Sequence, residues 1–296
     1  MAESTIAVRC AELLGDWLQP VIPSTARSWL ADRLRQISEG DQSALFLGFG
    51  MVPRKTGKAD LRLSAAQLAA AQEARPGWNP ATWSIDQAAR TLLLLAYPAD
   101  AVDEYTDTLD KLFAAGEVGE LVALYQALPL LPFPDAHVWR TRECIRTNMK
   151  SVFCAVAHRN PYPAEHLDEA SWNQLILKCL FVGAALDPVV GLDSRVNPRL
   201  MTMLVDYAHE RWAAKRQVSP ELWRPVGPVA DARALADLEK VYTEGTPPER
   251  QAAALALSVC PLPSAETILN RNPLLATQAR CRQLTWSQIA ADSASG

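Results

Sequence analysis

Residues 168–182, DEASWNQLILKCLFV, decide the fold class. Placed on a helical wheel at about 100° per residue, their apolar side chains cover nearly the whole circumference. A helix that is apolar on almost every side is buried among other helices. Gln174 and Lys178 share its narrow polar stripe, with Ser171 beside them. The stretch predicts a central helix, whose lysine either reaches solvent, forms a pair or borders a wet cavity.

The same three- and four-residue spacing of apolar residues continues through the chain, and alternating strand patterns are hard to find. Proline and glycine fall mostly between the periodic segments. We therefore predict an all-α protein of stacked helix pairs, either a HEAT-like or irregular α-solenoid or a multi-helical bundle. Helices are expected at 3–18, 23–38, 41–51, 64–74, 84–97, 100–115, 117–128, 135–158, 168–183, 197–216, 231–242, 247–259 and 264–290, the last one broken.

Several helix starts have a local cause. Asp135 and Asn197 can cap free N–H groups, and Pro198 suits the first helical position. Thr246 and Glu249 have the spacing of a capping box. The segment 248–257 is dense in small residues, which lets helices pack closely. Loops are expected at 52–63 and 75–83.

Residues 129–134, which begin and end in proline, form the weakest point of the periodic pattern. They suggest an N-terminal lobe at 1–130 and a C-terminal lobe at 131–296, unless the two form one continuous domain.

Composition excludes some classes of function. The 296 residues carry a net charge of −4, which gives no global basic surface for nucleic acid. Apolar runs are far shorter than the roughly 20 residues that span a bilayer, so the protein is not itself transmembrane. The N-terminus lacks the basic and apolar regions of a secretory signal. Six cysteines without a C-x-x-C pair indicate reduced, mostly buried thiols and a cytoplasmic location.

The common catalytic signatures are missing. Gly48 and Gly50 lack the third glycine of a dinucleotide loop, and the spacing from Gly50 to Lys58 does not fit a phosphate-binding loop. There is no G-x-S-x-G motif, and the histidines have no H-E-x-x-H spacing. We therefore expect no metal and no cofactor, and we favour a function other than catalysis.

Cations on apolar helix faces are the more informative feature. Arg142 and Arg146 project into the apolar arc of the expected helix 135–158, and Arg211 lies within that of 197–216. Together with Lys178 they suggest a charged cavity between three helices, where helical folds often bind ligands. Structural salt bridges, or stems that reach solvent, are the alternative.

A second basic stretch contains Arg54, Lys55, Lys58 and Arg62. A solvated loop explains it, and a contact with phosphate or acidic lipid is the alternative reading.

Several unusual strings resemble the EboA family. They are Arg146-Thr147-Asn148, Asn160-Pro161-Tyr162-Pro163-Ala164, 169–178, 197–211, 220–224, Ala74-Arg75-Pro76-Gly77-Trp78 and Trp83-Ser84-Ile85-Asp86-Gln87-Ala88-Ala89-Arg90. The resemblance covers about residues 45 to 260 and is strongest between 142 and 224.

The resemblance implies a member of a bacterial gene cluster that moves or processes precursors of secondary metabolites, alongside enzymes that include a UbiA-like membrane prenyltransferase. It implies a cytoplasmic location, at the inner membrane if that enzyme is the partner, and it supplies no catalytic residue. The candidate ligand-binding residues are Arg142, Arg146, Asn148, Asn160, Tyr162, Trp172, Asn173, Gln174, Lys178, Asp206, Tyr207, His209, Glu210 and Arg211.

Two main hypotheses remain at this point. The first is a non-catalytic helical module of metabolite traffic that binds an anionic metabolite or a cluster partner in the polar cavity. The second is an enzyme acting on a prenyl- or sugar-phosphate intermediate, with Lys178, His209 or Glu210 as acid–base groups. A scaffold that grips the membrane enzyme is a third reading.

Overall fold

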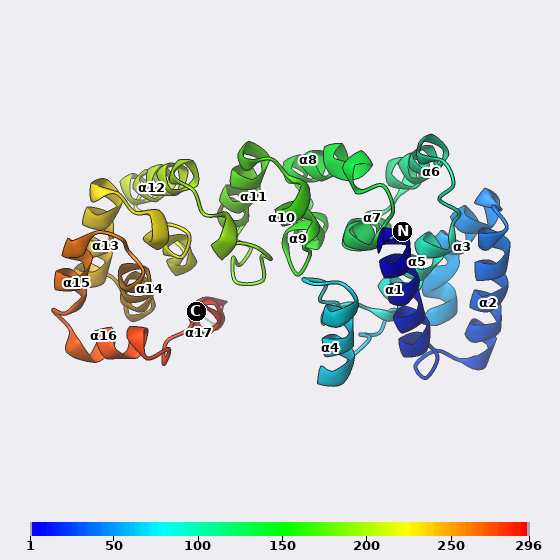
Figure 1. Ribbon diagram of the computed structural model, residues 1–296, viewed down its shortest axis with the longest axis horizontal. Coiled ribbons are helices and arrows are strands. Elements are labelled where there is room, and N and C mark those ends of the chain that lie inside the picture. The colour runs from blue at the N-terminus through cyan, green and yellow to red at the C-terminus, as the bar shows by residue number, and fades with distance from the viewer. Residues whose placement is uncertain (1, 295–296) are drawn as a thin grey trace. The chain divides into compact units, whose positions relative to one another are not determined.

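A computed structural model describes residues 2–294 of the chain, and within them it is all-α, as predicted (Figure 1). The β pairing among these residues is limited to one isolated antiparallel bridge between Asp60 and Ser84. The stacked-pair or HEAT-like arrangement stays a prediction.

The chain divides into two compact units, residues 1–167 and 168–296. Unit 1 contains α1 (Ala2–Leu18), α2 (Ser24–Ser38), α3 (Gln42–Thr56), α4 (Ala65–Ala74), α5 (Ile85–Ala96), α6 (Val102–Ala115), α7 (Val118–Ala127), η1 (Leu128–Leu130), η2 (Pro134–His137), α8 (Val138–Arg146), α9 (Lys150–Ala157) and α10 (Tyr162–His166). Unit 2 contains α11 (Glu169–Phe181), η3 (Asp193–Arg195), α12 (Pro198–Ala213), η4 (Pro220–Trp223), η5 (Gly227–Val229), α13 (Ala232–Glu244), α14 (Pro247–Ser258), α15 (Pro263–Leu269), α16 (Pro273–Arg280) and α17 (Trp286–Ala294).

Helix α5 is the centre of unit 1. It packs against α1, α2, α3 and α7, and α7 packs in turn against α9 (Figure 1). Leu93 and Leu94 of α5 are fully buried, and so is Phe153 of α9. Because α7 contacts both α5 and α9, packing continues through residues 129–134. The lobe boundary expected near residue 130 therefore lies inside unit 1.

Helix α14 is the centre of unit 2. It packs against α13, α15, α16 and α17, and four of its alanines have no exposed surface: Ala252, Ala253, Ala254 and Ala256. Because alanine has a short side chain, neighbouring backbones approach closely. At Gly227 of η5, a Cβ atom would lie 2.6 Å from the carbonyl oxygen of Ala256. The small-residue segment 248–257 thus has the packing role that its sequence indicates.

Two of the three predicted helix starts are confirmed. The Asn197 side chain accepts a hydrogen bond from the Leu200 amide at 2.8 Å, with Pro198 in the first turn of α12. Thr246 and Glu249 form a capping box at α14. The third was wrong, because the Asp135 side chain is fully exposed and caps no helix.

The long helix expected at 135–158 is interrupted. The region forms η2, α8 and α9, with a break at residues 147–149. The Thr147 hydroxyl accepts a hydrogen bond from the Met149 amide at 3.2 Å, a local bond that competes with the helix. Neither glycine nor proline marks the break, so the sequence pattern did not reveal it. Helix α3 continues to Thr56, into a segment predicted to be a loop. Helix α10 also lies where no helix was predicted.

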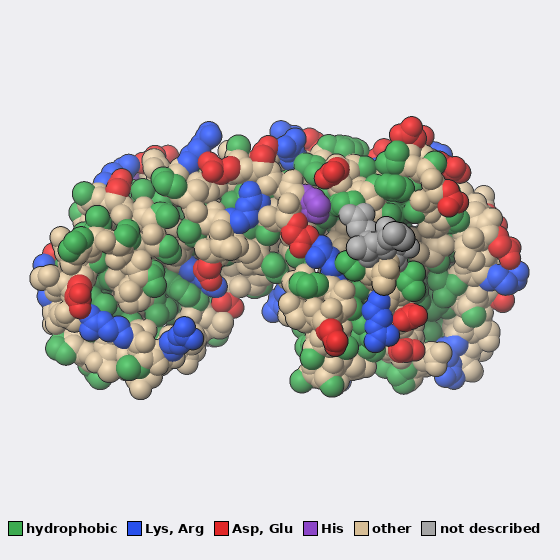
Figure 2. All heavy atoms as spheres, in the orientation of Figure 1, with side chains coloured by type: hydrophobic (Ala, Val, Ile, Leu, Met, Phe, Trp, Pro, Cys, Tyr) green, Lys and Arg blue, Asp and Glu red, His purple; other side chains and the backbone are tan. Residues whose placement is uncertain are grey.

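The six cysteines form no disulfide, and three are buried: Cys10, Cys144 and Cys179. No helix of the described residues is long and apolar enough to cross a membrane. In the space-filling view of Figure 2, cationic and anionic side chains are interspersed over the visible face.

Candidate functional site

Arg142 and Arg146, predicted to point inward, are exposed in α8. The Arg146 side chain is 72% exposed and pairs with Glu143 of the same helix. The prediction assumed one continuous helix, and the break at 147–149 changes the phase of its apolar arc. The inward cation of α8 is instead Arg140, whose side chain is 2% exposed. Asn148, in the break itself, is also exposed.

The candidates on α11 and α12 belong to unit 2, whereas Arg142 and Arg146 belong to unit 1. Lys178 and Arg211 are half-buried, and the Arg211 Nε atom donates a hydrogen bond to the Gln217 carbonyl at 2.9 Å. Gln174 and Glu210 are exposed.

The remaining unit 2 candidates have internal partners. The amides of Asn173 and Asn197 exchange two hydrogen bonds, at 2.9 and 3.1 Å. His209 lies 2.8 Å from a carboxylate oxygen of Asp237. Asp206 pairs with Arg233 at 2.8 Å.

Two further candidates on these helices pack against the unit itself. The Tyr207 hydroxyl donates to the Leu180 carbonyl at 3.3 Å. Trp172 is fully buried and lies under the guanidinium of Arg195. These contacts satisfy the Asn173 amide and the Tyr207 hydroxyl within unit 2. The Trp172 Nε1 atom, by contrast, is buried without a hydrogen-bond partner among the described residues.

Asn160 and Tyr162 fix a turn of unit 1 that borders a small pocket, although neither residue lines this pocket. Asn160 is 3% exposed, and its Nδ2 atom donates to the carbonyls of Tyr125 at 3.0 Å and Ala155 at 3.1 Å. Its Oδ1 atom accepts from the Tyr162 amide at 3.0 Å, and the Tyr162 hydroxyl donates to the Pro134 carbonyl. Asn160 therefore fixes the turn after α9 against the end of α7.

The pocket that this turn borders has a volume of about 130 Å³ and is partly open. We call it the α7–α9 pocket. Its lining comes from the loop before α5, from α7, from α9 and from the following turn: Thr82, Trp83, Gln126, Ser151, Cys154, Ala155, His158 and Arg159. A cavity of roughly 150 Å³ holds a molecule the size of benzene, so this pocket suits a small ligand or the head of a larger one.

Gln126 provides an unused acceptor in this pocket. Its Oε1 atom is buried and accepts no hydrogen bond from any described residue. A buried polar atom without a partner costs free energy, roughly 1–3 kcal/mol, unless a ligand or water satisfies it. A bound group with an O–H or N–H donor would remove that cost.

Arg159 provides the charge. Its backbone adopts the left-handed region, with φ of 52°, which is uncommon for a residue with a side chain. Its side chain is half-buried and forms no ion pair or hydrogen bond with the rest of the described chain. Residues held in sparsely populated backbone regions cluster at functional sites.

The lining contains no carboxylate, so the field in the α7–α9 pocket favours anions. Burial raises the pKa of the Cys154 thiol, and the positive charge of Lys150 opposes this only partly. Cys154 therefore lines the pocket as an uncharged thiol and is not an activated nucleophile at neutral pH. The arrangement can bind an anion with a hydrogen-bond donor, and it offers no paired acid and base.

Sequence reasoning missed the lining residues Gln126, Ser151 and Arg159. His158 and Arg159 directly precede the Asn160 string in the sequence. Their closeness to the Asn160 string was a usable signal, since that string lies within the resemblance. The left-handed backbone of Arg159 has no signature in the sequence, because a glycine would normally mark it.

A buried polar cluster elsewhere in unit 1 serves the fold. Arg140 pairs with Asp110, donates to the Thr106 carbonyl at 3.1 Å and lies 3.4 Å from the Nδ1 atom of His137. Burial lowers the pKa of His137 to about 4, so this imidazole is neutral near pH 7. The nearby Tyr105 hydroxyl is buried without a partner.

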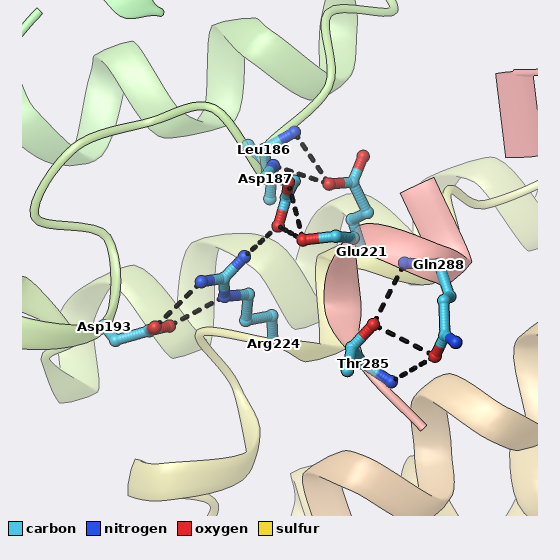
Figure 3. Close-up of polar contacts among 8 residues, drawn as sticks. Leu186, Asp187, Asp193, Glu221, Arg224, Thr285 and Gln288 are labelled. Atoms are coloured by element: carbon cyan, nitrogen blue, oxygen red, sulfur yellow. Dashed lines mark hydrogen bonds and ion pairs between the residues drawn. The ribbon is translucent and has the colours of Figure 1, made fainter. Parts of the chain in front are cut away.

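A polar cluster in unit 2 is shown in Figure 3. Glu221 points at the backbone amides of Leu186 and Asp187, from which its Oε1 atom accepts hydrogen bonds of 3.0 and 2.6 Å. Burial raises the pKa of Glu221, and these two amides oppose that rise. Arg224 bridges Asp187 and Asp193 in the same view. Since these groups satisfy one another, the cluster stabilises the loop between α11 and α12.

His, Cys, Asp and Glu side chains of the described chain do not gather in groups of three that could hold a metal ion. A family model described as metabolite traffic protein EboA matches residues 10–227. The match includes every residue of the α7–α9 pocket. Comparisons with curated proteins and with solved structures give no match.

Proposed function

The chain belongs to the EboA family of metabolite traffic proteins, and from this premise we propose that it binds a small anionic metabolite in the α7–α9 pocket without transforming it. The observation that carries the proposal is that one pocket is lined by both a cation without a partner, Arg159, and a hydrogen-bond acceptor without a donor, Gln126. A phosphate or carboxylate that carries a hydroxyl satisfies both groups.

The pocket replaces the cavity expected between three helices. That cavity needed Arg142 and Arg146 to point inward, and both are exposed. The volume limits what the pocket encloses, so a prenyl or sugar phosphate would place its head group inside and the rest outside.

The test is a binding titration monitored by the intrinsic tryptophan fluorescence of the chain, to which Trp83 of the pocket lining contributes. The probes are glycerol 3-phosphate, glucose 6-phosphate and dimethylallyl phosphate, with uncharged glycerol as the reference. We expect at least one phosphate to bind and glycerol to have no effect. The variant R159Q should weaken the binding of that phosphate by roughly 10- to 100-fold, because one charge-assisted hydrogen bond contributes roughly 1.5–3 kcal/mol.

Matched variants separate the pocket from general charge effects. Q126L should weaken binding, and S151W should block it, because Ser151 is exposed at the rim. R199Q removes an exposed cation of unit 2 and should leave binding unchanged. The proposal is wrong if no probe binds, or if R159Q and R199Q bind the phosphate equally well.

The enzyme hypothesis has less support. Glu210 is exposed, His209 is held by Asp237, and neither lines the α7–α9 pocket. Phosphorus NMR of each probe after prolonged incubation with the protein distinguishes the two hypotheses. An unchanged spectrum supports binding alone, and a new phosphorus signal that R159Q abolishes would favour catalysis. A cluster partner such as a UbiA-like membrane prenyltransferase, and a cytoplasmic location, remain part of the proposal.

A further inference from the structure

One face of α3 exposes apolar side chains to solvent. At 100° per residue, its outward positions are Ser43, Leu47, Gly50, Met51, Arg54 and Lys55, and all six are exposed. Leu47 is 65% exposed and Met51 36%. Single exposed apolar residues are ordinary, but these two are one helical turn apart on the same face.

Cations continue this face beyond the helix. Arg54, Lys55, Lys58 and Arg62 are exposed, and none forms an ion pair within the described chain. Six other exposed arginines form ion pairs: Arg9 with Glu12, Arg35 with Glu39, Arg146 with Glu143, Arg233 with Asp206, Arg271 with Glu239 and Arg280 with Glu266. The stretch 54–62 of the described chain therefore carries, within nine residues, four cations without an ion pair.

Nearby carboxylates do not neutralise the stretch. Asp60 is the single acid between residues 54 and 62. Glu120 of α7 borders the face at Gly50, but it pairs with the buried Arg90 at 3.6 Å and bonds the Glu117 amide at 3.0 Å.

The loop after α3 is held in place. The Leu61 amide donates to the Trp83 carbonyl, and the Ile85 amide donates to the Ala59 carbonyl, both at 2.9 Å. Leu61 is buried, whereas its neighbour Arg62 is exposed in the left-handed region. The cations of this loop are therefore displayed by an ordered segment close to the end of α3.

We propose that this face of α3, with the loop 57–62, binds the surface of an anionic lipid bilayer. Long cationic side chains beside exposed aliphatic ones on one helix face are typical of segments that lie in a membrane interface. Each Lys or Arg near such a surface adds attraction to acidic headgroups, and Leu47 and Met51 can enter the boundary of the acyl region. This inference is independent of the α7–α9 pocket, because none of these residues lines it.

The test is co-sedimentation of the full chain with vesicles. One set is phosphatidylcholine alone, and the other contains about 30 mol% phosphatidylglycerol. We expect the partition coefficient to be about tenfold higher for the anionic set and to fall to that of the neutral set in about 0.5 M NaCl.

Variants identify the face. The triple variant R54Q/K55Q/K58Q should lose the preference for anionic vesicles, and L47S/M51S should weaken binding at constant charge. The charge-matched control R233Q/R271Q/R280Q removes paired cations of unit 2 and should bind like the unaltered chain.

The proposal fails if both vesicle sets bind the chain equally, or if the control variant loses as much binding as R54Q/K55Q/K58Q. Equal binding to poly-glutamate and to anionic vesicles, with no effect of L47S/M51S, would instead assign the face to an acidic protein and overturn the lipid proposal.

Discussion

The side-chain amide of Asn160 donates a hydrogen bond of 3.0 Å to the backbone carbonyl of Tyr125, which joins the turn after α9 to the end of α7. N160A removes this bond and those to Ala155 and Tyr162, and leaves buried polar groups unpaired. We expect the free energy of unfolding to fall by about 2–4 kcal/mol in urea titrations. N148A, at an exposed asparagine, should change it by less than about 0.5 kcal/mol. Similar losses in both variants would show that Asn160 does not anchor the pocket.

Removal of the hydroxyl group should affect stability differently at Tyr105 and at Tyr242. The Tyr105 hydroxyl is buried without a partner, whereas that of Tyr242 donates to the Leu269 carbonyl at 2.8 Å. Y105F removes an unsatisfied group and should leave stability unchanged or raise it, while Y242F should cost about 1 kcal/mol. Thermal unfolding of both variants measures the difference. A clear loss of stability in Y105F would reveal a partner for its hydroxyl.

His137 should make stability depend on pH. Burial, with a smaller contribution from Arg140, lowers its pKa from 6.5 to about 4 in the folded chain. Between these values the unfolded chain binds the proton and the folded chain does not. The contribution of His137 to the free energy of unfolding is therefore fully present above about pH 6.5. It falls as the pH drops toward 4, by about 3 kcal/mol over that range.

The variant H137Q isolates this effect, because glutamine can still donate to the Pro132 carbonyl that His137 contacts. Urea unfolding at several pH values between 7 and 4.5 should show a smaller slope for H137Q than for the unaltered chain. Parallel slopes would mean that His137 is protonated in the folded chain.

Arg224 binds both carboxylate oxygens of Asp193, through Nε and Nη2, each at 2.8 Å. Burial works against its charge, but the bonds to Asp193 and Asp187 outweigh burial and raise the pKa of Arg224. Lysine cannot form this two-point contact, so R224K should lower the free energy of unfolding by roughly 1–2 kcal/mol. R199K, at an exposed arginine without an ion pair, is the control and should have little effect. Equal unfolding curves would remove this contact as a source of stability.

The sequence predicted what depends on local pattern. The all-α fold class followed from the spacing of apolar residues, and the helix starts at Asn197 and Thr246 followed from capping chemistry. The break at 147–149 was missed, because Thr147 ends α8 through a side-chain bond and not through glycine or proline. Because of that one error, Arg142 and Arg146 were predicted to point inward and Arg140 was missed. Arg140 is buried with Asp110 as its partner, 30 residues away in the sequence.

The α7–α9 pocket could not be predicted, because its walls come from segments that meet only through tertiary packing. Gln126 and Arg159 are 33 positions apart in the sequence, and neither belongs to a known motif. Asn160 was identified through the resemblance, and its position turned out to be beside the pocket. The resemblance thus pointed to the turn beside the pocket, but it did not point to Gln126 or Arg159, on which the proposed function rests.

The buried alanines of α14 limit which substitutions unit 2 can accept. Ala252, Ala253, Ala254 and Ala256 have no exposed surface, and Gly227 is held against Ala256. Each added methyl group at these positions enlarges a side chain in a packed interior, at a cost of about 1–3 kcal/mol, whereas removal of a methyl leaves little space to refill. We therefore expect these positions to tolerate larger residues such as valine and leucine least of all.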